Sequence, residues 1–253
     1  MPRRARKLSK TGIYHIMLRG INKQLIFEDD EDKIRFLETL KKYKEKNHYQ
    51  LYSYCLMDNH IHLLIKEVDE PISETIKRLS SSYVYWYNMK YERVGHLFQE
   101  RFKSENVENA TYFLTVLRYI HQNPIKAGLA TNIFDCKWTS IQDYIHKVNL
   151  VDVDLGFKLF SKDRRKALPL FLTYMQQSND DQCLDEKEKV RMTDSDVIRA
   201  MYELGITNTS LLQQMDKKSR DAVLIKLKKL DGVTVRQLSR ITGISKSVIQ
   251  RVH

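Results

Sequence analysis

The amino-acid sequence predicts an α+β fold, an antiparallel sheet with packed helices, followed by a small all-α domain. Strand-like and helix-like patterns alternate over the first 150 residues. A link of two polar residues, Asp58-Asn59, separates two apolar segments and is typical of an antiparallel hairpin. Beyond residue 190 the apolar residues recur with helical spacing alone. Strands and helices mixed in this way indicate a sheet covered by helices.

Four segments are predicted to be strands. Residues 49–57 and 61–66 flank the hairpin link, and residues 98–107 form the last strand. The first strand covers residues 13–19, and Gly20 ends it. Its side chains alternate between two faces, with Tyr14, Ile16 and Leu18 on one and His15, Met17 and Arg19 on the other.

Three helices are predicted around these strands. Residues 30–46 carry apolar side chains every three or four positions, with acids at the start and lysines at the end, as the helix macrodipole favours. Pro71 begins a second helix that runs to about Tyr91. Residues 110–122 form a third, which we expect to end around Asn123-Pro124, because a proline disfavours helical geometry in the residue before it.

The rest of the chain divides into a helical extension, a linker and a helical domain. We assign residues 1–180 to the first domain, the polar residues 181–192 to the linker, and residues 193–253 to the second domain. In the second domain, Gly243 separates the last two helices, and Ser245 is placed to cap the final one.

Charge is concentrated at the two ends of the chain. The net charge is +11; residues 1–10 carry five basic and no acidic residues, and residues 215–253 carry ten basic and three acidic ones. Basic ends of this kind favour a polyanion partner, most simply nucleic acid, and simple solvation is the alternative. The chain has no apolar run long enough for a membrane span and no signal peptide, so we expect a cytoplasmic protein without a membrane partner.

The histidine pair His60 and His62 directly follows the hairpin link. Residues two apart on a strand point to the same face, so both imidazoles lie side by side while Ile61 faces the core. Two neutral imidazoles form half of a divalent-metal site. Two histidines on a solvated sheet face are the alternative, and the pair by itself does not decide between them.

A second motif places Tyr119 and Asn123 four residues apart on the third helix, so that they share one face. A tyrosine there could act as a nucleophile toward phosphorus, and the amide oxygen of Asn123 could be a third metal ligand. A packed tyrosine with a satisfied hydroxyl is the alternative.

A family resemblance rests on four blocks of residues, two of which contain these motifs. The blocks are 12–20 (GIYHIMLRG), 26–27 (IF), 57–64 (MDNHIHLL) and 119–129 (YIHQNPIKAGL). In order and spacing the blocks are similar to those of the REP-associated tyrosine transposases, relatives of the HUH single-strand transposases of small bacterial insertion sequences. The resemblance covers about residues 1–150, continues weakly to about residue 178, and does not extend to residues 190–253.

The resemblance implies a ferredoxin-like sheet and a specific reaction. His60, His62 and Asn123 match the metal ligands and Tyr119 the catalytic tyrosine, which implies an enzyme that cuts one DNA strand beside a hairpin through a 5′-phosphotyrosine intermediate. We expect Mg²⁺ or Mn²⁺ as the cofactor, although an imidazole pair also accepts Zn²⁺. A non-catalytic DNA-binding regulator with the same fold is the alternative; a zinc hydrolase would lack an acidic residue at a typical spacing such as HExxH.

Several residues are candidates for DNA contacts. In the first domain these are Arg3, Arg4, Arg6 and Lys7 of a basic arm, and Arg19, Arg101 and Lys103 on or near strands. The C-terminal segment is similar to a helix-turn-helix of the Trp-repressor or DnaA-like kind, with duplex contacts expected from Ser245, Lys246, Ser247, Gln250 and Arg251. The expected partners are therefore single-stranded hairpin DNA and duplex DNA, bound by a monomer or a dimer.

Overall fold

The computed structural model describes residues 7–146, 148–181, 183–184, 192–230 and 232–252. Arg3, Arg4 and Arg6 of the predicted basic arm lie outside the described residues. The chain divides into two compact units, Met1–Asp185 and Glu186–His253. Each unit has its own hydrophobic core, and each is described by itself.

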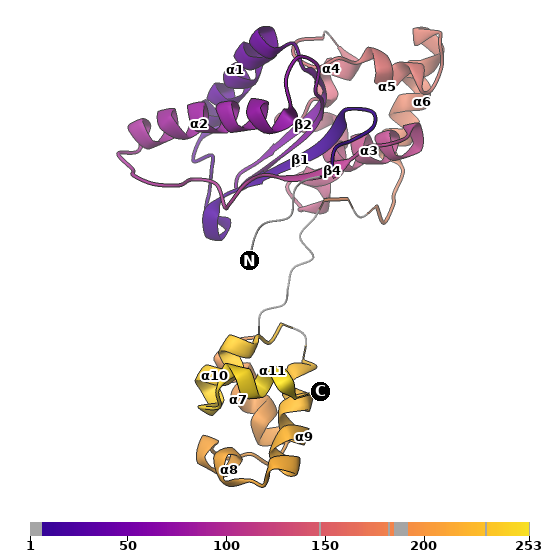
Figure 1. Ribbon diagram of the computed structural model, residues 1–253. Coiled ribbons are helices and arrows are strands. Elements are labelled where there is room, and N and C mark those ends of the chain that lie inside the picture. The colour runs from indigo at the N-terminus through magenta and orange to yellow at the C-terminus, as the bar shows by residue number, and fades with distance from the viewer. Residues whose placement is uncertain (1–6, 147, 182, 185–191, 231, 253) are drawn as a thin grey trace. The chain divides into compact units, whose positions relative to one another are not determined.

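The first unit is built on a four-stranded antiparallel sheet (Figure 1). Its strands are β1 (Ile13–Arg19), β2 (Gln50–Met57), β3 (His60–Lys66) and β4 (Lys103–Asn106), in the spatial order β2-β3-β1-β4. Helix α1 (Asp30–Asn47) connects β1 to β2, and α2 (Ile72–Lys90) connects β3 to β4. This order of elements is the ferredoxin-like topology, and the predicted α+β fold is confirmed.

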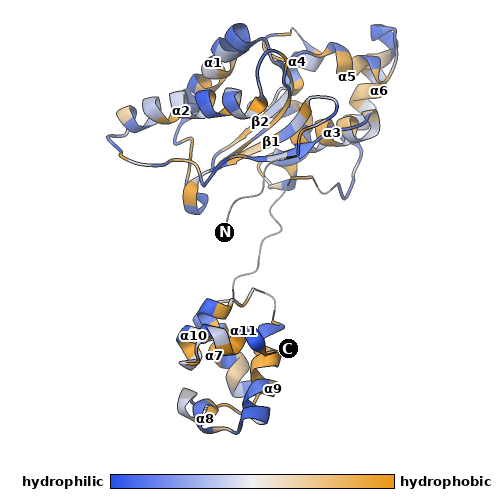
Figure 2. Ribbon diagram, viewed as in Figure 1, coloured by the Kyte–Doolittle hydropathy of each residue, from blue (hydrophilic) through white to orange (hydrophobic). Residues whose placement is uncertain are grey.

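Helices α1 and α2 cover one face of the sheet. Phe27, Phe36 of α1 and Tyr83 of α2 meet edge to face with ring centroids 5.2–5.8 Å apart, a geometry that aromatic pairs prefer. The hydroxyl of Tyr83 donates to the carbonyl of Ile26, which satisfies the buried polar atom. The strands themselves are largely hydrophobic (Figure 2), so this layer is held chiefly by burial of apolar surface.

Helix α1 begins with a capping box. The side chain of Asp29 accepts from the backbone N–H of Asp32, and Asp32 caps the backbone of Asp29 in return. Lys90, at the end of α2, pairs with both carboxylates at 2.8 Å. The acidic start of α1 is therefore tied to the basic end of α2.

The opposite face of the sheet carries α3 (Ala110–Lys126), which packs on β2 and β3. The expectation that this helix ends around Asn123-Pro124 is wrong, because α3 includes Pro124 and continues to Lys126. The φ angle of proline is itself helical, and its missing N–H removes one hydrogen bond only. The ladder resumes with Ala127 N–H donating to the carbonyl of Asn123. Asn123 therefore stays helical, one turn after Tyr119.

Strand β4 is shorter than predicted. The sequence predicts a strand over residues 98–107, but only Lys103–Asn106 pairs continuously, with β1. Phe98 forms an isolated bridge with Gly20. Glu100 between them has φ of 55°, a left-handed conformation that interrupts an extended strand.

The remaining helices of the first unit follow α3 along the chain. They are α4 (Ile141–Ile145), α5 (Asp154–Lys158) and α6 (Arg164–Gln176), and a short 3₁₀ turn at Ile133–Asp135 precedes them. Another 3₁₀ turn, Ile21–Lys23, lies between β1 and α1. The backbone carbonyls of Met175 and Gln177 both accept from the side chain of Gln122 on α3. The end of α6 is thereby fastened to the helix that carries Tyr119.

The second unit contains five helices among its described residues: α7 (Asp194–Glu203), α8 (Thr209–Gln214), α9 (Lys217–Lys228), α10 (Val235–Thr242) and α11 (Lys246–Arg251). Gly243 ends α10 in the left-handed conformation, with φ of 70°. Ser245 occupies the N-cap position of α11, but its hydroxyl contacts Ser247 Oγ at 3.1 Å, so the expected side-chain cap is absent. No helix of the described residues is long and apolar enough to cross a membrane.

Candidate active site

The histidine pair lies at the start of β3, directly after the hairpin turn. The rings of His60 and His62 are nearly perpendicular, with centroids 5.1 Å apart. Ile61 between them is fully buried. Strand alternation thus places both imidazoles on the sheet face that α3 covers, as the sequence predicts for this pair.

Helix α3 brings Tyr119 and Asn123 onto this histidine pair. Nε2 of His60 lies 3.3 Å from Oδ1 of Asn123. The Tyr119 ring meets the His62 ring edge to face with centroids 5.6 Å apart. The four residues singled out by sequence therefore converge from two elements that are distant in the chain.

A third histidine, His15 on β1, belongs to the same cluster and was missed as a site residue. Its Nε2 lies 2.9 Å from Nδ1 of His62, and its ring is 5.7 Å from the ring of Tyr119. The available signal was its place on the same strand face as Arg19. This position indicates that His15 lies near His62 only when β1 is known to pair with β3, in a register that sets Met17 opposite His62 and His15 two residues away on the same face.

Asn59, in the hairpin turn, was missed as well. Its Oδ1 lies 2.6 Å from Nδ1 of His60. Each histidine of the pair therefore has its Nδ1 engaged by a neighbour, Asn59 for His60 and His15 for His62.

Burial keeps the imidazoles of His15 and His62 neutral. It lowers the pKa of His15 to about 3, and both His15 and His62 are fully buried. Burial also lowers the pKa of His62 well below its usual value, and electrostatic interactions with His15, His60 and Arg19, each of which would oppose a second positive charge, lower it further. Neutral imidazole is the form that binds a metal ion.

The residues present fit a divalent cation. Among the residues that the structure describes, Nε2 of His62 is buried and has no hydrogen-bond partner. A lone pair there, Nε2 of His60 and the amide oxygen of Asn123 make a donor set of two nitrogens and one oxygen, which suits several divalent metals. Within the described part of the chain, no group of three or more His, Cys, Asp and Glu side chains is placed to hold a metal, so the amide of Asn123 is essential to this set.

Tyr119 lies deep in the site. The ring is fully buried, and its hydroxyl oxygen is buried with it. Nζ of Lys126 lies 5.0 Å from the centroid of the ring and also contacts the carbonyl of Asp181 at 3.2 Å. A bound molecule can reach the hydroxyl only after a local movement that uncovers Tyr119.

Two of the predicted DNA-contact residues border this cluster. Arg19 pairs in register with His60, and Lys103 pairs with Met17, so both stand on the strand face of the histidines. Lys103 is exposed and Arg19 is half-buried. Arg101 is exposed in the loop before β4, and Lys7 is exposed near the N-terminus.

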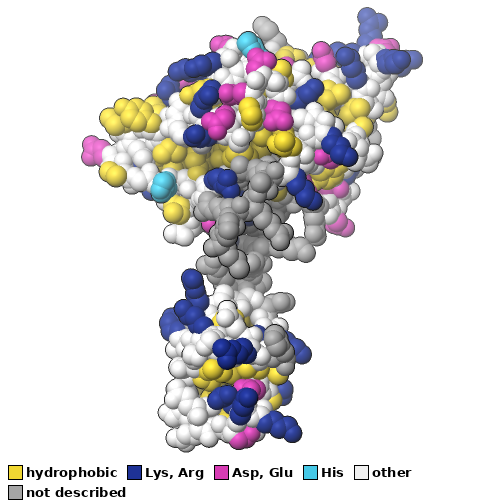
Figure 3. All heavy atoms as spheres, in the orientation of Figure 1, with side chains coloured by type: hydrophobic (Ala, Val, Ile, Leu, Met, Phe, Trp, Pro, Cys, Tyr) yellow, Lys and Arg dark blue, Asp and Glu magenta, His cyan; other side chains and the backbone are white. Residues whose placement is uncertain are grey.

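The predicted duplex-contact residues are all exposed on or next to α11: Ser245, Lys246, Ser247, Gln250 and Arg251. Ile249 of the same helix is buried in the core of the second unit. Lys and Arg side chains are visible over the second unit in Figure 3.

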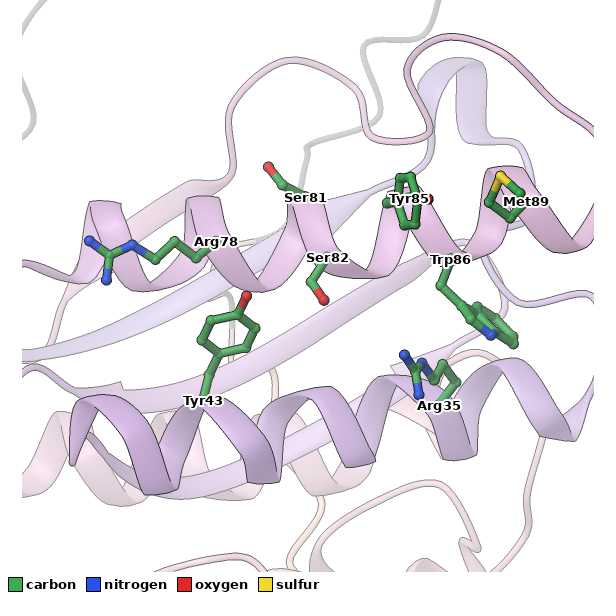
Figure 4. A pocket seen from close by; sticks show the side chains of 8 residues that line it. All are labelled: Arg35, Tyr43, Arg78, Ser81, Ser82, Tyr85, Trp86 and Met89. Carbon is green, nitrogen blue, oxygen red and sulfur yellow. The ribbon is translucent and has the colours of Figure 1, made fainter.

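A pocket of about 560 Å³ lies between α1 and α2 (Figure 4). Its lining combines arginines with aromatic and small side chains: Arg35, Tyr43, Arg78, Ser81, Ser82, Tyr85, Trp86 and Met89. None of the predicted site residues lines it. The arginines are already paired, Arg35 with Glu38 and Arg78 with Glu70, so the pocket presents little free charge.

Comparison with known proteins places this site in a family context. Residues 9–123 match the family described as "Transposase IS200 like", a range that includes all the residues of the cluster. Among solved structures, the chain is similar to a REP-associated tyrosine transposase bound to a REP hairpin, with a TM-score of 0.51 and 16% identity over 61% of this chain and 90% of that one. A putative transposase from Deinococcus radiodurans R1 matches with a TM-score of 0.35 and 17% identity over 51% of this chain and 100% of that one. No curated protein matches the chain.

Proposed function

We propose that the protein is a transposase that cuts single-stranded DNA beside a hairpin with the hydroxyl of Tyr119, and the match of residues 9–123 to the IS200-like transposase family supports this proposal. The observation that carries this proposal is the convergence of Tyr119, two imidazoles and an amide oxygen on one face of the sheet. A nucleophile and a set of metal donors in one place are what phosphodiester cleavage requires.

The proposed reaction is a transesterification. The phenolic oxygen of Tyr119 attacks phosphorus and forms a bond to the 5′-phosphate, while the bond from phosphorus to the 3′-oxygen breaks. The phenol loses its proton to solvent, and the departing oxygen takes up a proton to become a free 3′-hydroxyl. Because one phosphate ester replaces another, the step needs no nucleotide cofactor.

His60, His62 and Asn123 would hold the divalent cation, Mg²⁺ or Mn²⁺. When bound, such a cation supplies positive charge to the scissile phosphate as negative charge develops there. The chain contributes the rest: Tyr119 provides the nucleophile, and the packing of α3 on β3 holds its ring beside the ring of His62.

Basic residues around the site would hold the DNA strand. Arg19 and Lys103 stand on the strand face of the histidines and are suited to the phosphates next to the cut. Arg101, Lys7 and the arm residues Arg3, Arg4 and Arg6 would add contacts farther along the strand. The similar solved transposase is described as bound to a REP hairpin, which supports a hairpin as the structured part of the substrate.

We infer a separate DNA contact for the second unit. Helices α10 and α11 are joined by the short turn at Gly243 and pack on each other, an arrangement typical of a helix-turn-helix. The five candidate residues are exposed and Ile249 anchors the helix. Duplex binding there would hold the enzyme near its hairpin target.

A second candidate function is a DNA-binding regulator without catalysis. The observation that favours it is the complete burial of the Tyr119 hydroxyl, since a residue that never becomes accessible could not attack DNA. Such a regulator would bind the same hairpin and leave it intact.

One experiment separates the two functions. The full chain is incubated with Mn²⁺ and 5′- or 3′-labelled single-stranded DNA carrying a repeat hairpin of the host genome with its flanks. We expect a protein–DNA adduct that survives denaturation and is confined to the fragment 3′ of the cut, because that fragment carries the 5′-phosphate. Tyr119→Phe should bind the DNA and form no adduct; an adduct with Tyr119→Phe would show that another residue is the nucleophile. Binding without an adduct in the native protein would favour the regulator.

A further inference from the structure

We propose that His15 is a positioning residue: it accepts the Nδ1 proton of His62 and so leaves the Nε2 lone pair of His62 for a divalent cation. This inference rests on the proposed function, in which His62 is a metal ligand. The hydrogen bond joins His15 Nε2 to His62 Nδ1 over 2.9 Å, and both rings are fully buried. Water therefore does not compete for it.

Two neutral imidazoles can share this hydrogen bond in two ways. In the first, His62 donates from Nδ1 and His15 accepts at Nε2, which places the remaining lone pair of His62 at Nε2. In the second, His15 donates and His62 accepts, so the proton of His62 sits on Nε2. A protonated Nε2 has no lone pair for a metal, and only the first arrangement makes His62 a ligand.

The other histidine of the pair shows the same arrangement. Nδ1 of His60 lies 2.6 Å from Oδ1, the side-chain amide oxygen of Asn59, and this oxygen can only accept a hydrogen bond. Oδ1 of Asn123, which also only accepts, lies 3.3 Å from Nε2 of His60, so a neutral His60 donates to only one of the two amide oxygens. Donation to Asn59, over the shorter distance, leaves the lone pair of His60 at Nε2. With Asn59 as the acceptor for His60 and His15 as the acceptor for His62, both proposed ligands are held at Nδ1 and present the lone pair of Nε2 to the cation.

Without a cation, neither arrangement provides an acceptor for every N–H group of the two rings. Among the described residues, Nδ1 of His15 and Nε2 of His62 are both buried without a hydrogen-bond partner. Each arrangement leaves one of these nitrogens as an N–H with no acceptor, so neither avoids that cost. A cation binds only the first arrangement, and binding selects it.

The first test measures metal binding without DNA. Mn²⁺ is titrated into the full chain, and the unbound ion is followed by electron paramagnetic resonance. His15→Phe keeps a ring of similar size but offers no acceptor, so we expect its Mn²⁺ affinity to fall by about 10–100-fold, as removal of a residue that supports a metal ligand typically does. His15→Gln restores an acceptor near the position of Nε2, and its affinity should return to within a few-fold of the native value.

The matched control is His121→Phe. His121 is also fully buried, lies on α3, and has one side-chain hydrogen bond, from its Nε2 to Ser140 Oγ at 2.8 Å. It should lose stability as His15→Phe does and keep its Mn²⁺ affinity. Equal losses of affinity in both variants would overturn the proposal, because general loosening of the fold would then be the cause. Native affinity in His15→Phe would overturn it as well.

The second readout is the tautomer of His62. Nitrogen NMR of protein labelled with ¹⁵N-histidine is recorded with and without Zn²⁺, which is diamagnetic and accepted by imidazole pairs. We expect the Zn²⁺-loaded His62 to carry its proton on Nδ1 and to bind through Nε2. Binding through Nδ1 would overturn the proposal. Neither readout uses DNA, so a protein that passes both and forms no adduct would refute the proposed cleavage only.

Discussion

Oδ1 of Asn123 and Nε2 of His60 lie 3.3 Å apart, and this pair joins the helix that carries Tyr119, the proposed nucleophile, to the strand that carries the histidines. Asn123 holds this place because α3 continues through Pro124. If the helix ended one turn earlier, the amide would lie outside the donor set. The pair therefore makes the proposed metal site sensitive to the last turn of α3.

Replacing Asn123 with alanine should weaken metal binding and leave the nucleophile in place. We expect the Mn²⁺ concentration for half-maximal adduct formation to rise about tenfold or more, since one of three ligands is lost. Asn123→Asp keeps an oxygen donor and should stay close to the native protein or improve on it. Adduct yield measured against Mn²⁺ concentration provides the comparison. A native Mn²⁺ dependence in Asn123→Ala would remove Asn123 from the donor set.

The buried histidines should make the first unit less stable at mildly acidic pH. Burial lowers the pKa of His15 and of His121 to about 3, whereas in the unfolded chain these groups take up protons below about pH 6.5. The unfolded state then binds more protons, so the free energy of unfolding is highest above pH 7 and falls as the pH drops from 6.5 toward 3. Each histidine contributes a loss of roughly 2 kcal/mol by pH 5.

Urea unfolding at pH 7, 6 and 5, in the presence of a chelator, measures this dependence. His121→Phe removes one of the buried histidines, so its stability should fall less steeply with decreasing pH, even though its stability at pH 7 is lower. If His121→Phe and the native protein follow the same slope, His121 is protonated in the folded state over this range.

The ion pair between Arg118 and Asp181 should stabilise the outer side of α3. Arg118 contacts Asp181 through two nitrogens, at 2.6 and 3.0 Å, and the two side chains are only 10% and 18% exposed. Arg118→Ala should lower the free energy of unfolding by about 2 kcal/mol, because a largely buried carboxylate loses its partner. Lys77→Ala removes the exposed pair with Glu74 and should cost less than about 0.5 kcal/mol. Similar values for both variants would mean that burial of the Arg118 pair contributes nothing.

The exposed cations of α11 should contribute to duplex binding. Lys246→Ala combined with Arg251→Ala removes two positive charges from this helix. We expect weaker binding to duplex DNA and a salt dependence whose slope decreases by about two, since each phosphate contact releases roughly one counterion. The adduct yield on hairpin DNA should be unchanged.

The control for charge alone is Lys217→Ala combined with Lys218→Ala at the start of α9, where both side chains are exposed. It makes the same change in net charge and should leave the salt slope near its native value. If both double variants lose the same amount of duplex binding, the second unit binds through overall charge and α11 is not a reading helix.

Local patterns in the sequence predicted most elements of the first unit. Alternation of side chains located β1, β2 and β3, and helical spacing located α1, α2 and α3, because both signals depend only on neighbours along the chain. The limits of β4 and α3 were wrong, since the left-handed Glu100 and the tolerated Pro124 depend on tertiary packing.

The site was predictable in part for the same reason. His60 and His62 are two residues apart and Tyr119 and Asn123 are four apart, so each pair can be recognised within one element. His15 joins them only through the pairing of β1 with β3, and Asn59 only through the conformation of the hairpin turn. Neither the strand order nor a side-chain hydrogen bond can be read from residue spacing.

The strand order also has a consequence for how the site assembles during folding. β1 comes first in the chain, yet it lies between β3 and β4. Its pairings in the sheet can form only after both of these later strands are available. The hairpin of β2 and β3 needs only local contacts, which close quickly, whereas pairings between distant segments are slow. We therefore expect His60 and His62 to be set side by side early, on a hairpin that exists before the sheet is complete. His15 arrives only when β1 closes the sheet, so the site becomes complete in one of the late steps of folding.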